Sequence, residues 1–180
     1  MRIIAGDYKG RRLHAPLDDR IRPTTDKVKE AVFSILSSHM SLYDKNVLDL
    51  FAGTGNLGLE ALSRGARHCW FGDNSRDSLR LLKENIAYCK AADKATVMAG
   101  DFRKVLAGAG TKMDVIFLDP PYNKGLLPDC FSLIREYDLL EDGGLIIAEH
   151  RREEDLPEQM SDFEKIKERK YGTVVISIYS

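Results

Sequence analysis

A glycine-rich stretch follows a short apolar run in the first half of the sequence. Gly53, Gly55 and Gly58 have the spacing G-x-G-x-x-G, and residues 47–50 before them have the apolar pattern of a strand. Asp73 follows the next predicted strand, twenty residues after Gly53, where an acid can accept hydrogen bonds from both hydroxyls of a ribose. The strand, the glycines and the acid together predict a site for a cofactor that contains adenosine.

Two further acids distinguish between such cofactors. Asp49 comes directly before the glycine loop, where its charge would repel the pyrophosphate of a nicotinamide dinucleotide but attract the ammonium or sulfonium group of S-adenosylmethionine. Asp101 follows the third predicted strand and is a candidate acceptor for the adenine amino group, with Phe102 beside it to cover the ring. A plain N-cap of the next helix is the structural alternative for Asp101. The absence of G-x-x-x-x-G-K-[ST] from the sequence argues against a P-loop hydrolase, so these residues favour S-adenosylmethionine.

A second motif, Asp119-Pro120-Pro121-Tyr122, ends a buried apolar run. Ligands of open parallel sheets gather at the carboxyl ends of the strands, so this motif should face the glycine loop. The two prolines fix the backbone and leave the Asp119 carboxylate and the Pro120 carbonyl as a stiff pair of acceptors. Such a pair suits an exocyclic amino group of a nucleobase, and Tyr122 offers a ring on which the base can stack. The predicted chemistry is direct methyl transfer to that amine, governed by positioning and without a covalent enzyme intermediate.

Composition narrows the classes of protein. The 180 residues are 43% hydrophobic and carry 27 basic against 28 acidic side chains, which predicts one globular domain and excludes a wholly basic nucleic-acid coat protein. The apolar runs are too short for a membrane span, and the N-terminus has no signal-peptide pattern, so a cytoplasmic protein is expected. The three cysteines are too widely spaced for a disulfide framework or a zinc site, and the four histidines have no metal-ligand spacing, so no metal is expected. For His150 a structural role is favoured over a role in the site.

The elements that must position these motifs alternate along the chain. Strands are expected at 47–50, 68–72, 95–98, 113–118 and 145–149, and helices at 57–63, 79–88, 102–106 and 126–137. Strand and helix units in series predict an α/β fold with a parallel sheet. Residues 163–170 and 173–178 predict a hairpin at one edge of the sheet, and 151–159 is expected to be a charged, solvated loop.

The N-terminal part is basic. Residues 1–30 hold eight Lys and Arg against five acids, and their glycines and prolines predict a small hairpin followed by a helix. Phosphate contacts from such a patch would position RNA without reading its sequence.

The motifs resemble the RsmD family of bacterial ribosomal RNA methyltransferases. The resemblance rests on Met1-Arg-Ile-Ile-Ala-Gly6, Lys9-Gly-Arg-Arg-Leu13, residues 22–31, which begin Arg-Pro-Thr-Thr-Asp, residues 48–55 and residues 119–122. It spans essentially the whole chain. It implies a Rossmann-like, class I methyltransferase fold with a seven-stranded, mostly parallel sheet whose last strand is antiparallel. It also implies S-adenosylmethionine as methyl donor and N2 of one guanine in 16S rRNA, within a partly assembled small ribosomal subunit, as acceptor.

The resemblance also implies roles for residues at the matching positions. Cofactor contacts fall on Asp49, Ala52, Gly53, Thr54, Gly55, Asp73, Asn74, Asp101 and Phe102, catalytic roles on Asp119, Pro120 and Tyr122, and substrate contacts on Pro121, Arg2, Lys9, Arg11, Arg12, Arg22 and Thr24. Residues 1–40 would form the RNA-contacting hairpin and helix, and residues 41–180 the methyltransferase domain, in a monomer. Two positions depart from the family pattern: Asp73 stands where Glu is usual, and Asn56 where a small residue is common.

Three other functions remain as alternatives. A DNA adenine-N6 methyltransferase could use the same acceptor motif, but the interval between Gly58 and Asp119 holds no room for a separate region that recognises the duplex. A noncatalytic RNA-binding assembly module would not need Asp49 and Asp119. A nicotinamide oxidoreductase is opposed by Asp49 and by the lack of an evident partner for hydride transfer.

Overall fold

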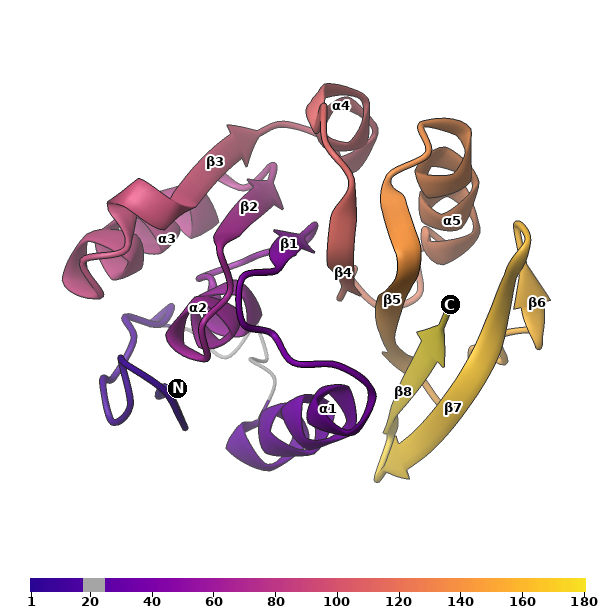
Figure 1. Ribbon diagram of the computed structural model, residues 1–180, viewed down its shortest axis with the longest axis horizontal. Coiled ribbons are helices and arrows are strands. Elements are labelled where there is room, and N and C mark those ends of the chain that lie inside the picture. The colour runs from indigo at the N-terminus through magenta and orange to yellow at the C-terminus, as the bar shows by residue number, and fades with distance from the viewer. Residues whose placement is uncertain (18–24) are drawn as a thin grey trace.

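The computed structural model describes residues 1–17 and 25–180. Helices and strands alternate through most of the chain (Figure 1). The helices are α1 (Asp26–His39), α2 (Asn56–Ser63), α3 (Arg76–Tyr88), α4 (Phe102–Gly108) and α5 (Leu127–Glu136), with a short 3-10 helix at Ala92–Lys94. The strands are β1 (Asn46–Asp49), β2 (His68–Asp73), β3 (Ala95–Ala99), β4 (Met113–Leu118), β5 (Leu140–Arg151), β6 (Gln159–Met160), β7 (Phe163–Tyr171) and β8 (Val174–Tyr179).

One sheet organises the molecule. Its strand order is β3-β2-β1-β4-β5-β8-β7-β6, in which β3, β2, β1, β4 and β5 are parallel neighbours and β8 pairs antiparallel with both β5 and β7. The expected antiparallel last strand is therefore confirmed. Since β1, β2 and β4 run in the same direction, the residues that follow them meet at one edge of the sheet.

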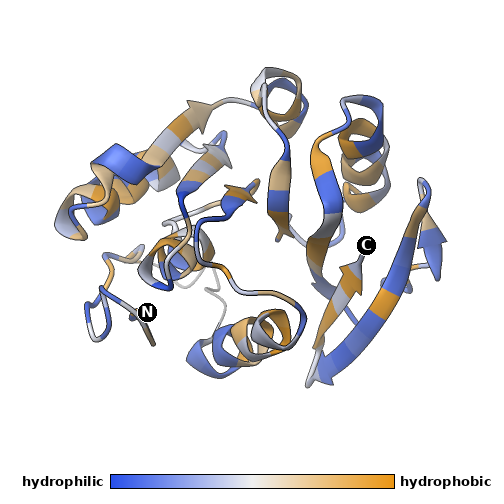
Figure 2. Ribbon diagram, in the orientation of Figure 1, coloured by the Kyte–Doolittle hydropathy of each residue, from blue (hydrophilic) through white to orange (hydrophobic). Residues whose placement is uncertain are grey.

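Alternating side chains of the strands build two hydrophobic layers. Val47 of β1 and Phe117 of β4 point to the face covered by α1, α2 and α3, whereas Leu48 and Ile116 point to the face covered by α4 and α5. Figure 2 shows the hydrophobic residues concentrated in the central strands, with mainly hydrophilic residues along β7 near the sheet edge. Nowhere in residues 1–17 and 25–180 is a helix both long and apolar enough to cross a membrane.

The three cysteines lie inside these layers, as small core residues. Cys69 and Cys89 belong to the layer under α1, α2 and α3, and Cys130 belongs to the layer under α4 and α5. Burial raises the pKa of all three thiols, that of Cys130 to about 12. At neutral pH each thiol is therefore protonated and unreactive.

Two strands differ from the expectation. The sheet has eight strands instead of seven, because Gln159–Met160 pairs with β7 in a stretch expected to be loop; Met160 buries its side chain in the layer under α5. β5 begins at Leu140 and not near residue 145. The pairing between β4 and β5 shifts register between Met113 and Val115, and the strand passes through Gly143, whose φ is +76°, in a sequence that resembles a turn.

The N-terminal segment folds back on itself and packs on α2. Within residues 1–17, a single β-bridge joins Arg2 to Arg12, so the expected hairpin is present in reduced form. Gly6 lies against the end of α2: its φ is +83°, and a Cβ there would meet the Ser63 carbonyl oxygen at 1.8 Å. The amide of Ile4 donates to both carboxylate oxygens of Glu60, so buried polar contacts fix this segment to the helix.

Candidate active site

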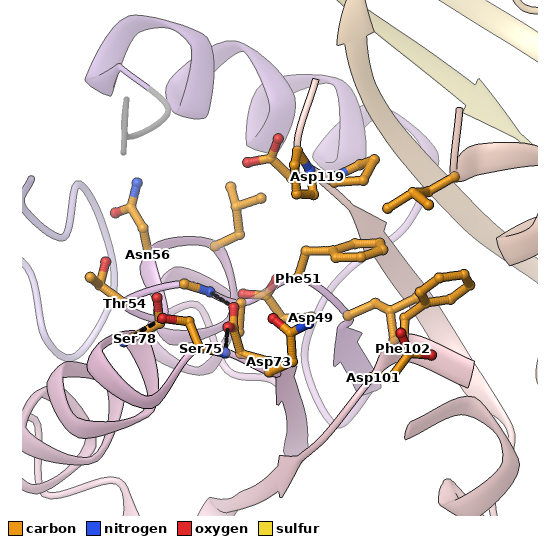
Figure 3. Close-up of a pocket in the computed structure, with 18 of the residues that line it drawn as sticks. Asp49, Phe51, Thr54, Asn56, Asp73, Ser75, Ser78, Asp101, Phe102 and Asp119 are labelled. Carbon is orange, nitrogen blue, oxygen red and sulfur yellow. Dashed lines mark hydrogen bonds between the residues drawn. The ribbon is translucent and has the colours of Figure 1, made fainter. Parts of the chain in front are cut away.

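A cavity of about 720 Å³ opens at the carboxyl ends of β1, β2 and β4, within the size range of small-molecule sites. Its wall combines the glycine loop, the start of α3, the start of α4 and the Asp119 corner. Figure 3 shows Asp119 across the cavity from Asp73 and Asp101. Of the predicted site residues, the cavity wall includes Asp49, Ala52, Gly53, Thr54, Asp73, Asn74, Asp101, Phe102, Asp119, Pro120, Pro121 and Tyr122.

Asp73 shapes the glycine loop. Its Oδ2 accepts a hydrogen bond from the Gly53 amide at 2.8 Å, and its Oδ1 accepts one from the Ser75 amide at 2.8 Å (Figure 3). A carboxylate has about four acceptor positions, so both oxygens can still accept further hydrogen bonds from a ligand. Asp73, although shorter than the Glu that is usual at this position, therefore holds the loop and still presents acceptors to the cavity.

The three glycines of the motif have different tasks. Gly53 has φ +56° and borders the cavity, with nothing within 4 Å of the position that a Cβ would occupy. Gly55 is absent from the cavity wall. Its φ of +89° and a Leu82 methyl 2.6 Å from its Cβ position show that it serves the backbone turn and the packing of α3. Gly58 lets α2 lie close against β2.

Gly58 gives a prediction on stability. A Cβ there would lie 2.2 Å from Phe71 Cε1 and 2.7 Å from Cys69 Sγ, so Gly58→Ala is expected to lower the free energy of unfolding by about 1–3 kcal/mol. Urea unfolding measures the change. Gly108→Ala is the matched control, because its nearest contact would be the flexible end of Met98 at 3.3 Å. Equal unfolding midpoints for the two variants would contradict the packing role of Gly58.

Asp49 is a buried carboxyl group on the cavity wall. It is 1% exposed, and its Oδ2 accepts a hydrogen bond from the Gly58 amide at 2.9 Å. Burial raises the pKa of Asp49 to about 7, the Gly58 amide opposes this shift, and the charge of Asp73 adds to it. A cation brought against Asp49 would favour its charged form.

Two aromatic rings border the cavity near the start of α4. Phe51 and Phe102 lie with ring centres 5.7 Å apart, and Phe102 is buried, with the Arg103 guanidinium over its ring. Asp101 is the N-cap of α4: its Oδ1 accepts from the Arg103 amide at 2.9 Å, and its side chain is half exposed. Asp101 thus has the structural role that the sequence left open, while it also lines the cavity.

The Asp119 corner lies opposite the glycine loop. Tyr122 donates its hydroxyl hydrogen to Glu149 Oε1 at 3.0 Å, and the Arg151 guanidinium carbon lies 4.4 Å from the centre of its ring. Burial, with the nearby charge of Glu149, raises the pKa of Tyr122 further above its usual value. Tyr122 is therefore a neutral phenol at any physiological pH, and it forms part of the cavity wall.

A buried lysine joins the N-terminal segment to the cavity wall. Lys29 on α1 has no solvent exposure, and its ammonium donates to Asn56 Oδ1 at 2.8 Å and to the carbonyl of Arg2. Desolvation lowers the pKa of Lys29, and the charge of Glu60 opposes this. Asn56, which departs from the small residue expected at its position, thus supplies an acceptor to a buried ammonium.

The predicted RNA contacts of residues 1–17 lie outside the cavity wall. Arg2 pairs with Asp26 at 3.2 Å, and Arg11 donates to the Cys89 carbonyl at 2.8 Å, whereas Lys9 and Arg12 are exposed. Arg22 and Thr24 lie outside the described residues. The segment reaches the cavity at its two ends, where Met1 and Pro16 form part of the wall.

Several cavity residues were not singled out from the sequence. They include Phe51, Ser75, Ser78 and Arg151, and also Asn56, which the sequence marked only as a departure from the family pattern. Ser75 is the N-cap of α3 and accepts from the Ser78 amide, a cap signal that is visible in the sequence, whereas the position of Arg151 depends on how β5 pairs with β4 and β8. His150 is buried and contacts Ser177 Oγ and the Arg151 carbonyl, in agreement with the structural role favoured for it. Within the described ranges, no group of three or more His, Cys, Asp or Glu side chains could hold a metal ion.

Comparisons with known proteins cover the whole chain. The family model described as "Conserved hypothetical protein 95" matches residues 1–180. YlbH of Bacillus subtilis (strain 168) is 41% identical over 99% of this chain and 98% of its own length. The Escherichia coli (strain K12) protein named "Ribosomal RNA small subunit methyltransferase D" is 36% identical over 99% of this chain and 89% of its own length. The solved structure of yhhF from Escherichia coli superposes with a TM-score of 0.87 at 35% identity, covering 99% of this chain and 96% of that one.

Proposed function

The chain belongs to the RsmD family, described as conserved hypothetical protein 95, and on that premise we propose that it methylates N2 of one guanine in 16S rRNA, with S-adenosylmethionine as methyl donor. One observation carries the proposal: the Asp119-Pro120-Pro121-Tyr122 corner and the glycine loop with Asp73 line the same cavity. The protein would act in the cytoplasm, as a monomer, on a partly assembled small ribosomal subunit.

The cavity suits the proposed cofactor. Asp49 is a buried carboxyl group for the ammonium or sulfonium group, Asp73 offers acceptors for the ribose, and Phe51 and Phe102 border an apolar space for the adenine. Ala52, Gly53, Thr54, Asn74 and Asp101 would complete the contacts. When bound, S-adenosylmethionine would supply a methyl group made electrophilic by the positive sulfur.

The Asp119 corner would position the acceptor amine. The Asp119 carboxylate and the Pro120 carbonyl accept its two hydrogens, which turns the nitrogen lone pair toward the cavity. Tyr122 stays protonated and supports the base by stacking, worth about 1–3 kcal/mol per base. When the methyl group passes to the nitrogen, the sulfur would leave as the neutral thioether of S-adenosylhomocysteine and the nitrogen would become positively charged. The Asp119 carboxylate is then basic enough to take the proton that the nitrogen loses.

The test of this function is an assay on the proposed substrate. The protein is incubated with labelled S-adenosylmethionine and immature small subunits, and the nucleosides of the RNA are then separated. Labelled N2-methylguanosine is the expected product. A parallel incubation contains duplex DNA in place of the subunits. Because the corner accepts any exocyclic amine, N6-methyladenine in the RNA, or label in the DNA but not in the RNA, would contradict the proposed acceptor and favour the adenine-N6 alternative.

The exposed N-terminal cations give a prediction on RNA binding. Lys9→Gln combined with Arg12→Gln is expected to weaken binding to immature subunits and to reduce the slope of log affinity against log salt by about 1.4, since each lost phosphate contact removes about 0.7. Binding is measured between low and high salt. Lys112→Gln with Arg135→Gln is the matched control, because each of these residues already pairs with an acid and neither belongs to the N-terminal segment. An unchanged slope in the first double variant would contradict RNA docking on the N-terminal segment.

A further inference from the structure

Two residues of β5 hold the aromatic ring of the acceptor corner. Arg151, the last residue of β5, lines the cavity, and its guanidinium carbon lies 4.4 Å from the centre of the Tyr122 ring. Glu149, two residues earlier on the same strand, accepts the Tyr122 hydroxyl hydrogen at 3.0 Å. β5 lies beside β4, which carries the Asp119 corner at its end (Figure 1). Arg151 is therefore fixed to the part of the site that would meet the target base.

The Arg151 guanidinium stacks on an aromatic ring without pairing with a carboxylate in the part of the chain that the structure describes. Arg103 stacks on Phe102 but also pairs with Asp129, and Arg135 pairs with Asp162. For Arg151, no ion pair occurs with any carboxylate of residues 1–17 and 25–180, and its buried Nε has no hydrogen-bond acceptor among them. Arg64 Nε is likewise buried without an acceptor among them, but the Arg64 guanidinium pairs with Glu60 at 3.3 Å. Since Arg151 lines the cavity and pairs with no carboxylate of the described residues, its guanidinium is suited to an acceptor that a ligand supplies there.

The chemistry of that ligand follows from the charge and shape of the group. A guanidinium has five N–H donors in one plane and binds phosphate oxygens through two parallel hydrogen bonds, while the face of the same plane can remain stacked on an aromatic ring. A nucleotide whose base lies against Tyr122 carries its own phosphate only a sugar away. The ring and the phosphate of one nucleotide can thus be held by two side chains that contact each other.

We propose that Arg151 is a positioning residue that binds the backbone phosphate of the target nucleotide while it holds the Tyr122 ring in place for the base. The proposal rests on the proposed function and adds an RNA contact inside the cavity to the N-terminal contacts at its border. Its effect is sequence-independent, because a phosphate contact fixes register without reading the base.

The test compares variants at Arg151 in an RNA-binding measurement that does not need turnover. Binding of immature small subunits is measured over a range of salt with the demethylated product, S-adenosylhomocysteine, present. Arg151→Gln is expected to weaken binding about tenfold and to reduce the slope of log affinity against log salt by about 0.7, the value for one phosphate. Arg151→Lys keeps the charge and is expected to retain the slope. Arg135→Gln, which removes one paired arginine from α5, is the matched control and is expected to leave both quantities unchanged.

The kinetics separate this role from a merely structural one. Arg151→Gln is expected to raise KM for the RNA substrate about tenfold while the Kd for S-adenosylmethionine stays within twofold of the wild type. An unchanged salt slope with a lowered kcat would mean that Arg151 acts only by supporting Tyr122, and would overturn the phosphate contact. The two proposals can fail separately. If the salt slope of RNA binding falls in Arg151→Gln but the wild-type protein transfers no methyl group, the proposed function is wrong and the phosphate contact is still supported.

Discussion

In the Asp119→Ala variant, kcat for methyl transfer is expected to fall by about a hundredfold to a thousandfold, while the Kd for S-adenosylmethionine stays that of the wild type. The reason is positional. Asp119 lies across the cavity from Asp49 and Asp73, so its carboxylate can meet the acceptor amine without contributing to the cofactor contacts expected of those two acids. Single-turnover measurement of kcat and calorimetric titration of the cofactor test the two parts separately.

The control for Asp119 is an acid outside the cavity. Asp129→Ala removes an exposed carboxylate that pairs with Arg103, and it is expected to leave both turnover and cofactor binding unchanged. Near-normal turnover in Asp119→Ala would refute the assigned role. Lost cofactor binding in that variant would show that Asp119 belongs to the donor side of the site.

Binding of S-adenosylmethionine is expected to weaken as the pH falls below about 7, by up to tenfold per pH unit. Burial raises the pKa of Asp49 to about 7 in the free protein, so the group becomes protonated below that pH. A positive ligand at Asp49 favours the ionised form and lowers its pKa, and binding below pH 7 must therefore release a proton. Calorimetric titration at pH 6, 7 and 8 in buffers of different ionisation enthalpy measures both the affinity and the released proton.

Asp49 makes cofactor binding and protein stability depend on pH in opposite directions: as the pH rises, binding strengthens but the free energy of unfolding of the free protein falls. The pKa of Asp49 is raised on folding, from 3.8 to about 7, so the folded chain binds more protons than the unfolded chain between these values. The free energy of unfolding therefore falls as the pH rises through this window. Asp49→Asn is expected to remove both pH dependences and to weaken cofactor binding at pH 8. Affinity that is independent of pH between 6 and 8 in the wild type would contradict this role of Asp49.

The positions of the motifs could be predicted because they depend on short stretches of sequence. Asp49, Asp73 and Asp119 each follow an apolar run, and parallel strands bring the residues after such runs to one edge of a sheet. The eighth strand could not be predicted, because Gln159–Met160 is too short to have a period and owes its pairing to the burial of Met160.

Contacts between elements that are distant in the sequence also could not be predicted. The hydrogen bond from Lys29 to Asn56 joins α1 to α2, and the contacts of Tyr122 with Glu149 and Arg151 join the loop after β4 to β5. Each pair is separated by more than twenty-five residues, and only the packed sheet sets the distance between its members. Composition and periodicity describe elements one at a time and therefore do not report such pairs.

The buried cysteines allow the opening of the two hydrophobic layers to be measured separately, because Cys69 and Cys89 lie in one layer and Cys130 in the other. A thiol reacts with an alkylating reagent as the thiolate, so modification of Cys69, Cys89 or Cys130 requires local or global opening of the structure around it. Mass spectrometry of the alkylated peptides would then follow the opening of each face of the sheet, without any substitution in the chain. Addition of S-adenosylmethionine during the reaction would tell which face the cofactor protects.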